Sequence, residues 1–509
     1  MKFTITFTLL LLSLISFAQP EGIRIGDPYD KVPGQRFTFQ DGYFGLCVTS
    51  EKKTVTIQKF DLRTNHEAAV FAFKDLPAGF YVEDVLKING KFYLFFSLAD
   101  KKAGMKALFS KEIILETARF SDETKELFVV ETVAPWMQHE LGFNMSITSR
   151  QFSLRLSNDG KYLAAAYQVK KEKKKDKVTN YGVKVLDKSF AVKSTTTTSD
   201  LSIPGENWVM DFAVTNAGVV LFNMRSKIKG EGKKYTVQSH LWSINNGKSS
   251  FSKLENDDKE CINSKFINTS KGTYLTSFYL NASQENTRGL LLNEFGADGS
   301  VSKTNKYPFS DELNIPYGLG KIMDKTLNTV TFEETEDGDI IIVAEENSTD
   351  ISGGGALEAV AAATGSAAFP TNYSKQICIL KLNSDLEFQW VRRIRKNQKH
   401  AQGDLNLSFA SAYDDGKLMI VLNDQLSNSI LKPEYPAKVF TGGSGGHVIL
   451  YDVMGHGTIK AHDVGEVAEI RGLSLSNFDK RTIYYLEDHF ILEMDRSKKE
   501  SALLYFKFE

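Results

Sequence analysis

The chain has 509 residues, a formal net charge of −1 and 42% hydrophobic residues. This composition allows a large buried core and excludes an intrinsically disordered chain. The near balance of charges argues against a strongly basic nucleic-acid-binding domain, so an electrostatic partner would have to be met by a local patch.

Residues 1–18 have the pattern of a signal peptide. A lysine precedes a short apolar run at residues 7–15, and Ser16 and Ala18 fit the small positions before a cleavage site. The run is shorter than the ~20 residues of a membrane-spanning helix, and no later segment of the sequence is long and apolar enough for one. The segment resembles the Sec signal peptides of Bacteroidetes proteins. This resemblance implies export, cleavage before Gln19 and a periplasmic or extracellular location.

Eight segments along the chain are each expected to form a strand, a tight turn and a second strand. In LSNDGKYLAAAY, at residues 156–167, an Asp-Gly pair separates two alternating runs, which is typical of a two-residue hairpin. Similar segments begin at Phe37, Leu86, Phe212, Phe266, Phe332, Ala410 and Leu475. The expected turn glycines are Gly42, Gly90, Gly160, Gly218, Gly272, Gly338 and Gly416. The segment at Leu475 has Asp479-Lys480 in place of a glycine turn.

Further alternating runs follow each hairpin. The third runs are VTIQKFDL, KALFSKEI, YGVKVLD, SHLWSIN, GLLLNEF, ICILKLN, HVILYDV and ALLYFKF. Most units then have a shorter fourth run, such as EAAVFAFK, FQWVRRI or TIKAHDV. Strands with a period of two, in units repeated about every 48 to 78 residues, predict one four-stranded antiparallel sheet per unit.

Four-stranded antiparallel units in series are typical of a β-propeller, whose radial packing protects the sheet edges. LSNDGKYLA resembles the inner-strand hairpins of WD-repeat propellers and of the Tol-Pal system propeller, although the chain has no series of WD dipeptides. We expect an all-β fold with a single propeller at residues 37–509, of eight blades, or of seven if one weak unit is an insertion. No linker divides the chain, which argues against two smaller propellers in tandem.

The N-terminal segment 19–36 contains a short strand-like run, GIRIG, at residues 22–26. The last repeat ends at its third strand, ALLYFKF. The run at 22–26 would therefore supply the missing fourth strand, so that both termini share one blade and close the ring.

Two insertions separate the second and third strands of the sixth and seventh units. Residues 352–374 are rich in Gly and Ala, and residues 426–446 are rich in Gly, Pro and Ser. Flexible loops are the simplest interpretation, but loops longer than ~12–15 residues are often functional. In the first insertion, Leu357 and Val360 would share a face of a short helix.

Lysines concentrate in the same connection of units two, three, four and eight, and in Lys52-Lys53 of unit one. These five units are consecutive around a closed ring, so their lysines would form a basic arc on one face. The candidate binding residues of this arc are Lys101, Lys102, Lys106, Lys170, Lys171, Lys173, Lys174, Lys175, Lys177, Lys227, Lys229, Lys233, Lys234, Lys498 and Lys499.

The basic arc has two interpretations. Exposed lysines at hairpin tips keep a protein soluble and block edge-to-edge pairing. Alternatively, the arc binds a protein or an anionic envelope or polysaccharide surface, and such binding would weaken with salt. Nucleic acid is not expected as a partner, because the tips contain no aromatic residues on which bases could stack.

The sequence contains no recognisable catalytic, metal or cofactor motif: no HExxH or CxxC spacing occurs, and no GxSxG nucleophile elbow or P-loop is present. His447 and His462 flank a predicted turn at 455–457, which would place them several residues apart along the hairpin rather than on one metal. We interpret the three cysteines as buried, inert thiols because each lies in or beside a strand-like run: Cys47, Cys261 and Cys378.

Two functions therefore remain open. The first is an exported, non-catalytic propeller that serves as an interaction platform in the bacterial envelope or outside the cell. The second is a carbohydrate-active or other hydrolytic enzyme with a carboxylate site at the channel mouth. A glycosidase needs two carboxylates ~5–10 Å apart, and the turns are rich in Asp, but the usual role of such residues is to bond local backbone.

Overall fold

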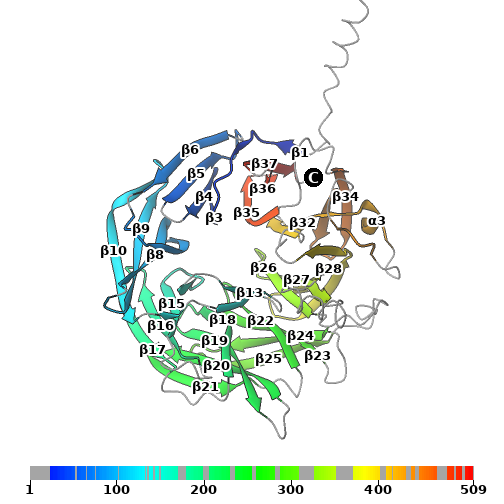
Figure 1. Ribbon diagram of the computed structural model, residues 1–509. Helices are drawn as coiled ribbons and strands as arrows, with labels where there is room; N and C mark the ends of the chain where they lie inside the picture. The colour runs from blue at the N-terminus through cyan, green and yellow to red at the C-terminus, as the bar shows by residue number, and fades with distance from the viewer. Residues whose placement is uncertain are drawn as a thin grey trace, which may run out of the picture.

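The alternating runs fold into eight four-stranded antiparallel sheets that stand as blades in a ring (Figure 1). The fold is therefore an all-β, eight-bladed β-propeller, as the sequence predicts, and the seven-bladed alternative is wrong. This computed structural model describes residues 23–51, 54–64, 66–74, 76–100, 102–131, 133–134, 137–140, 144–147, 151–169, 179–198, 206–229, 235–254, 260–280, 287–308, 326–350, 371–401, 409–414, 416–431, 437–441, 446–466, 478–486, 489–495 and 499–507.

Blades one to four follow one another along the chain, each with its first strand nearest the axis (Figure 1). Blade one contains β3 (Gln35–Asp41), β4 (Phe44–Glu51), β5 (Thr54–Asp61) and β6 (His66–Phe73). Blade two contains β7 (Tyr81–Ile88), β8 (Lys91–Asp100), β9 (Met105–Ile114) and β10 (Arg119–Glu131). Blade three contains β14 (Phe152–Leu156), β15 (Tyr162–Val169), β16 (Tyr181–Asp187) and β17 (Val192–Thr197). Blade four contains β18 (Glu206–Val214), β19 (Val220–Lys229), β20 (Tyr235–Asn245) and β21 (Lys248–Lys253).

Blades five to eight complete the ring. Blade five contains β22 (Glu260–Asn268), β23 (Thr273–Leu280), β24 (Thr287–Phe295) and β25 (Val301–Pro308). Blade six contains β26 (Thr326–Glu334), β27 (Ile340–Asp350), β28 (Thr371–Leu382) and β29 (Phe388–Ile394). Blade seven contains β31 (Phe409–Asp414), β32 (Lys417–Asp424), β33 (His447–Met454) and β34 (Ile459–Glu466). Blade eight contains β35 (Phe478–Leu486), β36 (His489–Asp495), β37 (Glu500–Lys507) and the N-terminal β1 (Ile23–Ile25).

Short strands extend some of these blades. Three of them lie in the connection between blades two and three, where β11 (Val133–Ala134) pairs with β15, and β12 (Met137–Glu140) pairs with β13 (Asn144–Ile147). Blade eight gains β2 (Tyr29–Asp30), and blade six gains β30 (Gln398–Ala401). The one helix among the described residues is the four-residue α3 (Leu426–Ser429). No helix in the described part of the chain has the length and apolar character needed to cross a bilayer.

Seven of the eight expected inner hairpins have their turns where the sequence predicts them. Gly160 and Gly338 show why glycine occupies these turns, since their φ angles of 67° and 78° lie in the left-handed region. The eighth expectation is wrong: Asp479-Lys480 is not a turn but part of β35, whose pairing with β36 is irregular between Phe478 and Ile483. The hairpin instead turns after Leu486, so HFILEMD is the second strand.

The core lies between the blades rather than at the centre of the ring. Between blades three and four, Phe222 stacks on Trp242, with ring centroids 4.6 Å apart, and both side chains are fully buried. Val183 and Val185 of blade three pack into the same cluster. Burial of one large apolar side chain contributes ~1.5–3 kcal/mol, so each such layer holds two neighbouring blades together.

The chain termini meet in blade eight and close the ring. β1 pairs antiparallel with β37, with Ile23 opposite Phe506 and Ile25 opposite Leu504. The run at 22–26 thus contains the fourth strand of the last blade, as expected from the sequence. Ile25 also packs against the apolar layer between blades seven and eight.

Strand direction divides the propeller into two faces. Because the four strands of a blade alternate in direction, the connection from the second to the third strand leaves at the same face as the connection to the next blade. We call this the connection face. The opposite face carries the tight turns between strands one and two and between strands three and four, and we call it the turn face.

Candidate functional site

The connection face carries the loops that the sequence analysis selected. The segments with the lysine runs lie between second and third strands of blades eight, one, two, three and four, which are neighbours in the ring (Figure 1). Lys102 and Lys499 are exposed in such connections, and Lys227 is exposed near the end of β19. Lys229 is the last residue of β19.

The remaining candidates lie outside the described residues, except for Lys106. They are Lys101, Lys170, Lys171, Lys173, Lys174, Lys175, Lys177, Lys233, Lys234, Lys498, Leu357 and Val360. The placement of Lys106 in an exposed tip needs correction. It is the second residue of β9 and is only 8% exposed. Burial lowers the pKa of its ammonium group, and attraction to Glu83 partly opposes this shift.

The second and third strands of blade six extend farther on the connection face than those of blades five and seven. β29 pairs with β28 only from Ile377 to Leu382, while β30 pairs with the first part of β28, from Thr371 to Ser374. The hairpin of β27 and β28 therefore extends beyond the blade and receives a new third strand there. The insertion of blade six joins the ends of this extension.

The insertion of blade seven is attached to the same place. Phe440 makes backbone hydrogen bonds to the two residues that flank Gln398. Its N–H donates to the Asn397 carbonyl at 2.7 Å, and its carbonyl accepts from Lys399 N–H at 2.8 Å. Asn428 of α3 donates to the Asp424 carboxylate at 3.0 Å and accepts from Lys438 N–H at 2.8 Å. The described parts of this insertion are thus held against blades six and seven.

A buried ion pair lies beneath this attachment. Lys396 is 1% exposed, and its Nζ lies 2.5 Å from Glu345 Oε1 and 2.7 Å from Gln398 Oε1. Gln398 Nε2 in turn donates to the Asn423 carbonyl at 2.7 Å. Nearby, burial raises the pKa of Asp424 to about 6, although its bond from Asn428 opposes the shift. These contacts connect β27, β30 and β32 beneath the attachment.

Charged side chains of the first strands connect neighbouring blades around the axis. Glu83 of β7 accepts hydrogen bonds from Ser97 and from the N–H groups of Gln151 and Phe152, at the start of blade three. Burial raises the pKa of Glu83 to about 7, and these hydrogen bonds oppose the shift. Glu83 therefore acts as an anchor between blades two and three.

The same arrangement continues through blades three to six. Asp211 of β18 lies 3.7 Å from Arg155 of β14 and accepts from Phe266 N–H of β22 at 2.8 Å. Lys265 of β22 donates to the Val330 carbonyl of β26 at 3.0 Å. Each of these groups thus bonds to the inner strand of an adjacent blade, which is a structural use of charge.

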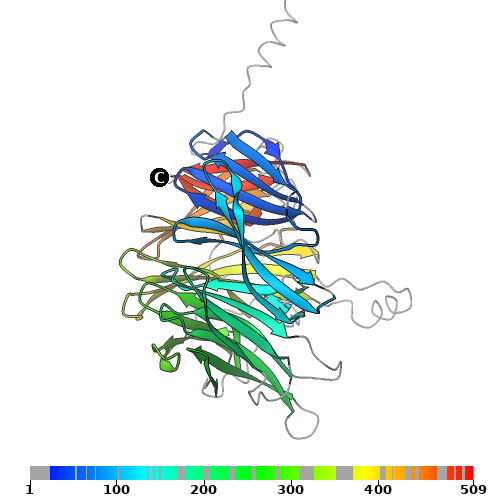
Figure 2. The same ribbon diagram turned by 90° about the vertical axis from the view of Figure 1, so that its left-hand side faces the viewer.

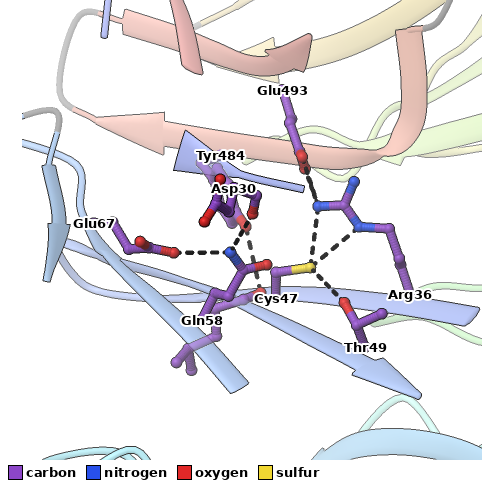
Figure 3. Close-up of polar contacts among 9 residues, drawn as sticks. Asp30, Arg36, Cys47, Thr49, Gln58, Glu67, Tyr484 and Glu493 are labelled. Atoms are coloured by element: carbon purple, nitrogen blue, oxygen red, sulfur yellow. Dashed lines mark hydrogen bonds and ion pairs between the residues drawn. The ribbon is translucent and has the colours of Figure 1, made fainter. Parts of the chain in front are cut away.

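Cys47 takes part in a third buried cluster, at the seam between blades one and eight (Figure 3). Its Sγ accepts from Arg36 Nε and Nη2 at 3.3 and 3.2 Å, and Arg36 Nη2 lies 2.5 Å from Glu493 Oε2. The thiol is fully buried, and burial raises its pKa although Arg36 opposes the shift. The cluster ties β3 to β36 across the closure of the ring and offers no accessible nucleophile.

The other cysteines and the histidines give no reaction centre in the described residues. Burial raises the pKa of the Cys378 thiol to about 12, and Cys261 is part of β22. His447 pairs with Asp463 at 2.9 Å and His462 with Asp452 at 3.0 Å, as two separate pairs. Within the described ranges no group of three or more His, Cys, Asp or Glu side chains could hold a metal.

Sequence reasoning missed the charged groups that organise both the axis and the connection face. The missed residues are Arg36, Glu83, Arg155, Asp211, Lys265, Glu345, Lys396 and Glu493. A signal was present in some of them, because Glu83 interrupts the strand YVEDVLKI and Glu345 directly follows IIIVA. A charge inside or at the end of an apolar strand is almost never buried without a partner.

Comparisons with known proteins assign the chain to no family. No protein-family description matches the chain, and no curated protein does. Among solved structures, the polysaccharide lyase Uly1 is 10% identical, with 97% of this chain and 94% of that chain covered and a TM-score of 0.36. The WD40 domain of SCAP from fission yeast is 7% identical, with 96% and 99% covered and a TM-score of 0.34. An endo-arabinase from Bacteroides thetaiotaomicron is 14% identical, with 56% and 98% covered and a TM-score of 0.26.

Proposed function

We propose that this protein is an exported, non-catalytic propeller that binds a partner through its connection face, in the bacterial envelope or outside the cell. The connection face carries the two long insertions and the lysine-rich connections. The turn face consists of short turns, which offer less surface that can vary or adapt.

The single observation that carries the proposal is the use of the buried carboxylates. A hydrolytic site needs carboxylates that face a substrate. Every buried carboxylate of the described residues instead has a partner within the protein. Glu83 bonds to Ser97 and two N–H groups, Glu345 to Lys396, Glu346 to Gln376, Asp424 to Asn428, Asp452 to His462, and Glu493 to Arg36.

The partner that fits the basic arc is an anionic surface, presented by a protein or by an envelope polysaccharide. With an overall charge of −1, attraction would be confined to the arc rather than spread over the molecule. Exposed charges are screened over ~8 Å at physiological salt, so binding would be strong at low salt and weak at high salt.

Export remains part of the proposal, on the basis of residues 1–18. The protein expressed with its own N-terminus in a bacterial host should be recovered outside the cytoplasm, and its mature form should begin at Gln19. Recovery of the uncleaved chain in the cytoplasm would contradict export without bearing on the binding surface.

Binding is tested with a charge-reversal variant of the third blade, in which Lys171, Lys173, Lys174 and Lys175 are replaced by Glu. We expect wild-type protein to bind isolated envelope fractions at low salt and to lose binding at high salt. The variant should bind weakly at both. Treatment of the fractions with protease separates the two kinds of partner, since a polysaccharide surface would survive it.

The matched control makes the same change of net charge on the turn face. It replaces four lysines beside the turns between third and fourth strands, which are exposed: Lys188, Lys248, Lys303 and Lys460. This variant should bind like the wild type. Equal loss of binding in both variants would show a general effect of charge. Binding that changes neither with salt nor in either variant would refute electrostatic binding through the basic arc.

A further inference from the structure

The outer strand of blade one differs from every other outer strand of the ring. From Ala68 to Phe73, β6 reads AAVFAF, without a polar side chain. The other outer strands each carry charged residues: β10, β17, β21, β25, β29, β34 and β1. Charges on an edge strand prevent its free N–H and C=O groups from pairing with another chain. The one carboxylate of β6, Glu67, precedes this stretch, so the stretch from Ala68 to Phe73 has no such protection.

One side of β6 is packed and the other is open. Phe71 and Phe73 pack toward blade two, where Phe73 lies 4.4 Å from the ring of Phe120 and Arg119 lies over Phe71. On the opposite side, Val70 is 47% exposed and Ala72 is exposed. Blade eight covers little of this side because its outer strand β1 has only three residues.

The outer edge of β6 is unpaired within the described residues, and it lies at the rim of the ring (Figures 1 and 2). β6 pairs with β5 on its inner edge, and the single irregularity, at Ala68, leaves Ala69 to Phe73 as a regular stretch. Five residues are enough for a typical strand pairing.

We propose that β6 pairs antiparallel with β6 of a second copy of this chain, so that the sheets of two blades join into one across a two-fold axis. A two-fold interface brings the same patch together from both copies. With the axis at Phe71, each Val70 would oppose Ala72 of the other copy, and Ala69 would oppose Phe73. Apolar residues would then face one another over the whole regular stretch.

The charges at the ends of β6 favour a second copy in this orientation. Glu67 precedes the apolar stretch and the exposed Lys74 follows it. Antiparallel pairing of identical strands brings the start of each strand next to the end of the other. Glu67 of each copy would therefore lie near Lys74 of its partner, whereas parallel pairing would bring like charges together.

The test is the oligomeric state of the full chain in solution, measured by sedimentation velocity between ~1 and ~100 µM. We expect a monomer–dimer equilibrium for the wild type. Val70→Lys places a charge on the open side of β6 and should raise the dimer dissociation constant at least about tenfold. A wild type that stays monomeric throughout this range overturns the proposal, as does an unchanged dimer of V70K.

A matched control carries the same substitution on another outer strand. Val192 of β17 is 41% exposed, similar to Val70, and Val192→Lys should leave the dimer unchanged. If V192K weakens the dimer as much as V70K does, the contact is not at β6. Circular dichroism of both variants verifies that they fold.

A disulfide cross-link tests the register of the proposed pairing between the two β6 strands. The double variant Val70→Cys and Ala72→Cys should form an intermolecular disulfide under mild oxidation, because these positions would face each other across the two-fold axis. Cys47 and Cys378 are buried and should not react. Failure of the double variant to cross-link, with wild-type dimer present, overturns the β6 pairing.

Discussion

At the scale of single residues, the propeller uses buried charges to fix one blade to the next. Glu83, Asp211 and Lys265 each bond to backbone groups of the adjacent blade. Apolar contacts are not directional, so they allow neighbouring blades to shift relative to each other. A hydrogen bond from a charged side chain is directional and fixes their relative position. Sequence reasoning did not identify these residues, because their partners come from other blades and no spacing along the chain reveals them.

Lysines show the same limit of sequence reasoning. Lys102 and Lys106 belong to one run in the sequence, and the strand boundary at Met105 separates them into an exposed turn and a buried strand position. Alternation along β9 decides which lysine is buried, and a shift of one residue reverses the assignment. Lysine content therefore locates a surface loop, but it does not establish that each lysine is on the surface.

Loss of Lys396 should destabilise the protein strongly. Lys396→Met would leave Glu345 buried without its cation, which typically costs about 3–5 kcal/mol. The double variant Lys396→Met and Glu345→Met should recover most of this loss, because no unpaired charge remains. Urea unfolding followed by tryptophan fluorescence measures both changes. Lys460→Met, at an exposed site, should change the free energy of unfolding by less than about 0.5 kcal/mol.

Glu83 should make stability fall as pH rises from about 4.5 to about 7. Burial raises its pKa from 4.5 to about 7 in the folded state, so the folded protein keeps a proton that the unfolded chain releases. The contribution of Glu83 to the free energy of unfolding is complete below pH 4.5 and is lost as the pH rises through 7. The shift corresponds to about 3 kcal/mol.

Glu83→Gln isolates this contribution. The wild type should lose stability relative to the variant across this pH range, and the difference should level off above pH 7. Unfolding curves at half-unit pH intervals measure it. A constant difference between the two proteins, from pH 4.5 to pH 8, would show that Glu83 does not titrate here.

At the scale of elements, hairpins were the most predictable feature. Local turn chemistry specifies them, since a glycine with positive φ between two alternating runs leaves few alternatives. The eighth hairpin was missed because no glycine marks its turn and because the irregular pairing of β35 hides its alternation. Strand β30 could not be foreseen either, since it pairs with an extension of β28 rather than with β29, the strand before it in the chain.

The short strand β1 should contribute more than its three residues suggest. Ile25→Asp would place a charge against the apolar layer between blades seven and eight and weaken the pairing with β37. We expect a loss of about 2 kcal/mol, the value of one buried aliphatic side chain. Hydrogen exchange should become faster at Leu504 and its neighbours. Val301→Asp, on the exposed outer strand of blade five, should leave exchange in β37 unchanged.

At the scale of the whole molecule, the sequence predicts the ring because each unit repeats the same four runs. A sheet with an apolar face on each side must bury both, and a closed ring does this for all blades at once. The location of the two insertions, on blades six and seven, was predictable from the sequence, but the contacts that hold the second one were not. The described part of the second insertion is held by residues about 40 positions earlier in the chain, at and beside β30, through the hydrogen bonds of Phe440 with Asn397 and Lys399.

Closure of the ring by strands from both termini should slow its unfolding. Blade eight combines β1 and the short β2 from the N-terminal part of the chain with three strands from the C-terminal part, so the ring cannot open at this seam without breaking a sheet. A circular permutant that joins Lys507 to Ile23 through a short glycine linker and opens at residues 255–259, between blades four and five, loses this feature. Each of its blades is one continuous segment. Its new seam has side-chain packing and hydrogen bonds such as that from Phe266 N–H to Asp211, but no strand pairing.

The permutant should fold to the same strand content but unfold faster than the native chain, since opening its seam breaks no strand pairing. The control permutant opens within blade five, at the turn 296–299 between β24 and β25. It restores a blade with one strand from the new N-terminus and three from the new C-terminus, and it should unfold at close to the native rate. Rates from denaturant jumps compare the three chains. If both permutants unfold equally fast, the faster unfolding comes from the new linker. Closure of blade eight by strands from both termini then does not stabilise the ring.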